Sequence, residues 1–107
     1  MASNLIRGHL EGLLLAVLVD EPGHGYALSQ RLAGRSGGGL AVPEGSLYPA
    51  LQRLEGLGLV TSSWASVEGR RRRVYTLSPT GRRRAESTAR EWRVFAAAMD
   101  RVLGGLT

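Results

Sequence analysis

Three short helices are predicted in the first half of the chain. Between residues 5 and 19, apolar side chains recur every three or four positions and form one wide stripe on a helix. Ser3 or Asn4 can cap the start of this helix. The same spacing predicts a second helix at 25–35 and a third at 44–57. Glycines follow each pattern and end the helices.

Pro49 lies inside the third predicted helix. A proline lacks a backbone N–H, and its ring clashes with the carbonyl group four residues back. We therefore expect the regular helix to begin near Gly45 or Ser46, so that Pro49 falls in its first turn.

Two strands and a hairpin are predicted after the third helix. Residues 59–64 and 72–77 contain side chains with strong β-propensity. The segment between them, 65–71, contains Glu68-Gly69 and is predicted to be the hairpin tip. Its arginines would project away from the core.

A long helix is predicted at 79–104, with Ser78 as its N-cap and Pro79 as its first residue. Its apolar positions step alternately by three and four residues, which is the heptad spacing of a coiled coil. A seam this narrow, on a terminal helix of about 39 Å (~1.5 Å per residue), predicts a dimerisation arm. The seam consists of Ala85, Thr88, Trp92, Phe95, Met99, Val102 and Leu106.

The composition is that of one small globular domain, with 107 residues, 43% of them hydrophobic and 21% charged. The chain has no cysteine and two histidines, which argues against disulfides and metal centres. We find no nucleophile–base pair or phosphate-binding loop, so we expect neither an enzyme nor a cofactor. The longest apolar run, 13–19, is shorter than the roughly 20 residues of a membrane span. With no signal-peptide pattern, the sequence predicts a cytoplasmic protein without a membrane partner.

Positive charge is concentrated in the second half of the chain. The formal net charge is +5, every basic residue is arginine, and ten of the fourteen arginines lie in residues 59–107. Most belong to two blocks, 70–73 and 82–84. Such asymmetry indicates that one face contacts a polyanion, and arginine suits both phosphates and guanine edges.

The order of the predicted elements is that of a winged helix-turn-helix. The fold class is mainly α with a small β-hairpin and a long C-terminal helix. In this arrangement the third helix enters the major groove of DNA and the hairpin forms the wing. We expect residues 1–78 to be the DNA-binding domain and 79–107 the dimerisation helix, within one compact unit.

Specific residues carry a resemblance to a known family. The chain contains His24-Gly25-Tyr26, then Gly45-Ser46-Leu47-Tyr48-Pro49-Ala50-Leu51 with Arg53-Leu54-Glu55, and later Gly69-Arg70-Arg71-Arg72 with Tyr75-Thr76-Leu77 and Gly81. These motifs and their spacing resemble the PadR family of bacterial transcriptional regulators. The single C-terminal helix resembles the short subgroup of that family.

The resemblance implies a homodimeric repressor that binds a palindromic operator in double-stranded DNA. Some short members of the family bind planar aromatic molecules in a cavity between the subunits, lined by an aromatic residue of the C-terminal helix. Trp92 occupies the matching place in this chain. Such a molecule would be the effector that releases the operator, with Phe95 and Met99 beside it on the seam.

Eight residues are candidates for contact with DNA. Ser46 and Tyr48 begin the recognition helix, where side chains approach base edges or phosphates, and Gln52 and Arg53 lie one turn further. Arg53 is predicted to clamp a phosphate, because phosphate contacts outnumber base contacts. In the wing, Arg70 and Arg72, or Arg71 and Arg73, would face DNA together, because side chains alternate along a strand.

Other residues have structural interpretations. His24 is predicted to open the second helix, and Tyr26 to pack between the first and third helices. The block 82–84 lies in the first turn of a helix, where cations oppose the macrodipole. Either DNA backbone or the neighbouring Glu86 can offset that penalty, and the sequence favours neither.

The sequence thus predicts a sequence-specific DNA-binding regulator, most simply a homodimeric repressor. Two alternatives stay open. An architectural DNA-binding protein would carry the same charge but bind without sequence preference. A winged-helix module that docks another protein would not need its arginine blocks for DNA. Within the regulator interpretation, the sequence does not exclude an activator.

Overall fold

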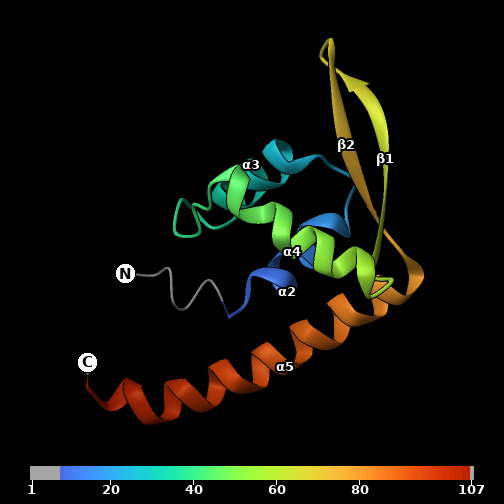
Figure 1. The fold of residues 1–107 in the computed structure, drawn as a ribbon. Helices are drawn as coiled ribbons and strands as arrows, with labels where there is room; N and C mark the ends of the chain where they lie inside the picture. Colours follow the sequence, from blue (N-terminus) through green and yellow to red (C-terminus); the bar gives the residue numbers. More distant parts are fainter. Residues whose placement is uncertain (1–7, 107) are drawn as a thin grey trace.

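Three helices pack around a leucine core, a hairpin stands at one side, and a long helix leaves along another (Figure 1). The computed structural model describes residues 8–106. In chain order the elements are α2 (Leu10–Leu18), α3 (Gly25–Arg35), α4 (Glu44–Gly56), β1 (Val60–Val67), β2 (Arg70–Leu77), α5 (Pro79–Leu103) and the short 3₁₀ helix η1 (Gly104–Leu106). This is the predicted winged helix-turn-helix order.

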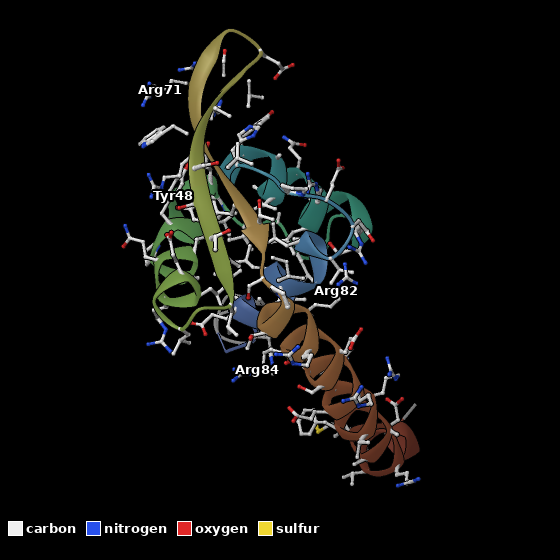
Figure 2. The ribbon with its side chains drawn as sticks, turned by 90° about the vertical axis from the view of Figure 1, so that its right-hand side faces the viewer. Tyr48, Arg71, Arg82 and Arg84 are labelled. Atoms are coloured by element: carbon white, nitrogen blue, oxygen red, sulfur yellow. The ribbon has the colours of Figure 1, made fainter. Side chains whose placement is uncertain are left out.

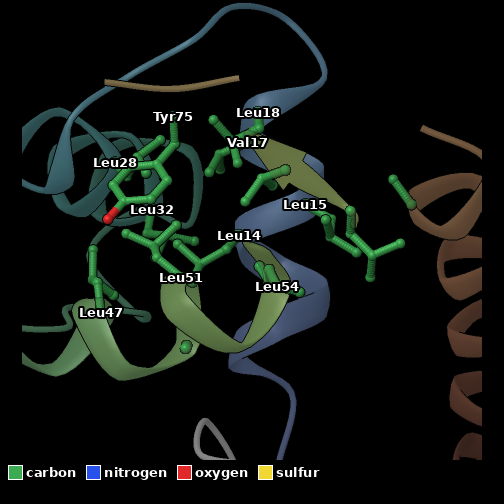
Figure 3. Packing of buried hydrophobic residues seen from close by; sticks show 14 of the residues in the cluster. Leu14, Leu15, Val17, Leu18, Leu28, Leu32, Leu47, Leu51, Leu54 and Tyr75 are labelled. Carbon is green, nitrogen blue, oxygen red and sulfur yellow. The ribbon is translucent and has the colours of Figure 1, made fainter. Parts of the chain in front are cut away.

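The core is built from the inward faces of α2, α3 and α4 (Figure 3). Leu14, Leu28, Leu47 and Leu51 are completely buried there. Burying a leucine side chain contributes about 1.5–3 kcal/mol. These four residues therefore stabilise the unit formed by α2, α3 and α4, which we call the head. Tyr75 of β2 also reaches into the cluster and attaches the hairpin to the helices.

The predicted inward packing of Tyr26 is wrong. Its side chain is 50% exposed and stacks on His24, with 6.4 Å between the ring centroids. Tyr26 lies two positions from the buried Leu28, which is about 200° around a helix and therefore on the opposite face. His24 does immediately precede α3, as predicted.

The first helix is shorter than its apolar pattern suggests. Gly8 and His9 form a turn, and α2 begins at Leu10. The predicted start at residue 5, with its caps Ser3 and Asn4, lies outside the described residues.

The expectation for Pro49 is also wrong. Helix α4 begins at Glu44, so Pro49 lies in the second turn rather than the first. The proline leaves the carbonyl of Gly45 without its usual intrahelical N–H donor. Both residues are exposed, so water can satisfy that carbonyl and the helix continues.

The hairpin is longer, and its tip tighter, than the sequence predicts. Strands β1 and β2 pair antiparallel from Val60↔Leu77 to Val67↔Arg70. Only Glu68 and Gly69 form the turn, and both have positive φ (53° and 77°), as a two-residue type I′ turn requires. All four wing arginines are therefore in β2 rather than in a loop, and their side chains alternate between two faces.

Backbone pairing fixes the base of the hairpin on the head. Gly23, in the loop before α3, exchanges two hydrogen bonds with Tyr75, at 3.0 and 2.9 Å. Ser78 then caps α5 as predicted, because its hydroxyl accepts a 3.0 Å hydrogen bond from the Gly81 N–H. The same hydroxyl donates to the carbonyl of Gly58. The wing and α5 thus leave the head from firmly held positions.

Candidate nucleic-acid interface

Helix α4 turns a polar face away from the core. Its leucines point inward, while Ser46 and Gln52 are exposed on the outer face. Arg53 is also exposed, but its Nε lies 2.6 Å from Oε2 of Glu11 on α2. That ion pair links α4 to α2, and it already partners the guanidinium that was predicted to bind a phosphate. Contact between Arg53 and DNA stays a prediction.

The wing carries a tryptophan between two arginines. Trp64 of β1 pairs directly with Arg73 of β2, so the two side chains share one face of the ribbon. The guanidinium carbons of Arg71 and Arg73 lie 5.1 and 5.4 Å from the centre of the Trp64 ring. Each contact is worth about 0.5–1 kcal/mol at an exposed site. Trp64 is 53% exposed, so this face offers an aromatic surface with cations on it.

The wing arginines differ in their interactions within the protein. Arg73 Nε donates a 2.9 Å hydrogen bond to the Ser62 hydroxyl, and Arg72 faces the carboxylate of Glu44 at 4.0 Å. Arg70 and Arg71 are exposed and form no ion pair within residues 8–106.

A hollow of about 340 Å³ separates the wing from α4. Tyr48 lies in its wall, close to Gly25, where any side chain would collide with the Tyr48 hydroxyl. That hydroxyl donates a 2.5 Å hydrogen bond to Oε2 of Glu44. The hydrogen bond, together with burial and the Glu44 charge, raises the pKa of Tyr48 to about 12. The lining residues are His24, Tyr48, Gln52, Trp64, Arg71, Arg72, Arg73 and Tyr75.

Figure 2 places Tyr48 and Arg71 on the same side of the head, while Arg82 and Arg84 lie where α5 begins. Arg82 donates a 3.1 Å hydrogen bond to the Val19 carbonyl, just beyond the C-terminal end of α2. A cation there is favoured by the negative end of the α2 dipole. This contact, which the sequence did not suggest, offsets the penalty of placing Arg82 in the first turn of α5.

The outer part of α5 carries the predicted apolar seam. Trp92 and Phe95 are each 49% exposed and Met99 is 41% exposed. His9 meets the Trp92 ring edge-on at 5.1 Å, and Phe95 lies 5.6 Å from it. Beside Trp92, a mostly apolar hollow of about 300 Å³ opens between α2 and α5. Its lining is His9, Gly12, Leu13, Ala16, Ala85, Thr88, Ala89 and Trp92.

Comparison with known proteins identifies the family. The profile described as the transcriptional regulator PadR-like family matches residues 14–87, from the core of α2 through the wing into α5. The chain belongs to the PadR-like family of transcriptional regulators. The resemblance drawn from the sequence motifs is thereby confirmed. Membership of the short subgroup stays a prediction.

Three similar proteins illustrate the likeness. A PadR family transcriptional regulator from Eggerthella lenta has a TM-score of 0.80 and 33% identity, over 96% of this chain and 88% of that chain. A transcriptional regulator of Mycobacterium tuberculosis is 47% identical over 63 residues, which are 59% of this chain and 56% of that protein. Bacillus subtilis PadR, solved in complex with operator DNA, shares the fold, with a TM-score of 0.66 and 20% identity over 75% of this chain and 46% of that chain.

The sequence analysis did not predict the roles of two residues in this PadR-like chain. Trp64 joins the wing arginines into one surface. Arg31 holds the loop after α2, because its guanidinium donates to the carbonyls of Glu21 and Pro22 at 2.8 and 2.7 Å. Trp64 is the one large aromatic residue among the small side chains of a predicted strand, and that was a usable signal. The sequence held none for Arg31.

Two further features bear on the function class. In the described part of the PadR-like chain, no helix combines the length and the apolar character needed to cross a membrane. Among residues 8–106, no three acidic or histidine side chains are grouped to hold a metal ion.

Proposed function

We propose that the chain is a cytoplasmic, homodimeric repressor that binds a palindromic operator through α4 and the wing. One observation carries this proposal: Tyr48 and Gln52 of α4 line the same hollow as three arginines of β2, at positions 71–73. The motif order and the operator complex of Bacillus subtilis PadR support it. Ser46 and Gln52 would reach base edges. Arg70 and Arg71 lie on opposite faces of the ribbon but next to its tip turn, where both long side chains would contact phosphates.

We further propose that residues 1–78 form the DNA-binding unit and that α5 pairs with α5 of a second copy. The exposed seam of Trp92, Phe95 and Met99 supports pairing, because a contiguous apolar surface of this kind marks an interface. Two heads so joined would enter successive major grooves, about 34–36 Å apart.

The apolar hollow beside Trp92 supports an effector site for a planar aromatic molecule. An aromatic ligand can stack on the Trp92 ring, and Phe95 stands next to it. If the ligand binds one separation of the two heads more tightly than another, it shifts the dimer toward that state and releases the operator.

A competition gel shift tests the proposal. The purified protein is incubated at ~0.15 M salt with a labelled duplex taken from upstream of its own coding sequence. Unlabelled copies of that duplex, or of an unrelated duplex of equal length, are then added. We expect only the upstream duplex to displace the label. Equal displacement by both would identify an architectural DNA-binding protein, and no shift would favour a protein-docking module.

A further inference from the structure

Glu44 interacts with two groups that a phosphate would also attract. Its Oε2 accepts the hydrogen bond of the Tyr48 hydroxyl at 2.5 Å, and the same oxygen lies 4.0 Å from Nη1 of Arg72. A hydroxyl donor from α4 and a guanidinium from β2 therefore converge on one anionic oxygen. A hydroxyl and a guanidinium are also the kinds of group that bind a phosphate oxygen.

The surroundings of this contact are positive. No acidic residue is among those that line the hollow between α4 and the wing, whereas three arginines are. Glu44 is thus the carboxylate that neutralises Arg72, whose side chain is only 23% exposed. Arg72 is partly buried, so its charge is screened less than the charges of the exposed Arg70 and Arg71.

We propose that this hollow is a seat for one phosphate of the DNA backbone, and that Glu44 holds its two binding groups in the free protein. The inference rests on the proposed DNA binding of this surface. A backbone phosphate competes with Glu44 for the Tyr48 hydroxyl and the Arg72 guanidinium, so wild type makes this contact only in part. Glu44 therefore weakens the attraction of the head for any DNA backbone, whatever its sequence.

The test compares the affinities of Glu44→Gln and Glu86→Gln for DNA. Both variants remove one negative charge, but Glu86 lies on α5, away from the hollow, so it controls for net charge. Binding is measured by fluorescence anisotropy over a range of salt concentrations, with the upstream duplex and with an unrelated duplex of equal length. The double variant Glu44→Gln/Arg72→Ala removes the guanidinium of the proposed seat.

We expect Glu44→Gln to bind both duplexes more tightly than Glu86→Gln does. One added phosphate contact steepens the plot of log K against log salt by about 0.9. Over a tenfold decrease in salt, from 1 M to 0.1 M, the affinity of such a variant therefore rises about eightfold more than that of the control. The gain should be equal on the two duplexes, because a phosphate carries no base sequence. It should disappear in Glu44→Gln/Arg72→Ala.

Two results would overturn the phosphate seat. The first is a Glu44→Gln affinity no higher than that of Glu86→Gln, and the second is a gain that survives the loss of Arg72. If glutamine at position 44 disturbs α4, Glu44→Ala gives the same comparison. Thermal unfolding of each variant shows whether it is folded. Failure of the proposed function looks different: wild type would not prefer the upstream duplex, while the Glu44 effect persists. Absence of binding to any duplex would overturn both proposals.

Discussion

The double variant Arg70→Ala/Arg71→Ala removes two positive charges that the structure leaves available to phosphates. Both side chains are exposed, and neither forms an ion pair within residues 8–106. Each phosphate contact contributes about 0.9 to the slope of log K against log salt, so the double variant should flatten the slope by about 1.8. Between 0.05 and 0.2 M salt, wild type should therefore lose about 12-fold more affinity than the variant does.

Anisotropy titrations at several salt concentrations measure these slopes. Arg83→Ala/Arg84→Ala is the matched control, because it removes two exposed arginines at the start of α5. Arg72→Ala should change the slope less than Arg71→Ala, because Glu44 already faces Arg72 at 4.0 Å. An unchanged slope in the wing variant would refute the assignment of the wing as a contact surface. Flattening in Arg83→Ala/Arg84→Ala as well would show that the start of α5 also contacts the DNA backbone.

Three further predictions concern stability, titration and assembly. Leu51 is fully buried, so Leu51→Ala should lower the free energy of unfolding by about 2–5 kcal/mol in urea titrations, whereas Leu57→Ala, at an exposed position, should change it little. The pKa of Tyr48 is raised to about 12, so absorbance at alkaline pH should show its phenolate forming later than in Glu44→Gln; its contribution to stability is present below pH ~10 and is lost as the pH rises toward 12. An arginine in place of Phe95 should convert a dimer into monomers in sedimentation experiments, and dimers that persist would remove the apolar seam from the interface.

The arrangement of elements was largely predictable because local signals agree with the fold. Helix α3 has the bounds that its pattern predicts, and Ser78 with Pro79 marks the start of α5. The strands of the hairpin are longer than the sequence predicts, because the run of arginines conceals the alternation of side chains along β2. Glu68-Gly69 contained the turn signal, since only two residues were needed to reverse the chain.

The site was less predictable because its contacts join residues distant in the sequence. Arg53 meets Glu11, which lies 42 positions earlier, and Arg82 meets the end of α2, 63 positions earlier. Neither pairing leaves a periodic trace that a single sequence can show. The pattern indicated which faces are polar, but only the packing shows which arginines are engaged within the head.

An NMR titration that follows the arginine Nε–H groups would show which of them meet DNA. Every basic residue is arginine, so one isotope label reports on all the cations as the upstream duplex is added. We expect Arg70 and Arg71 to respond, while Arg90, Arg93 and Arg101, on α5 away from the wing, do not. Responses confined to the α5 arginines would contradict DNA binding through α4 and the wing, because DNA would then bind another face.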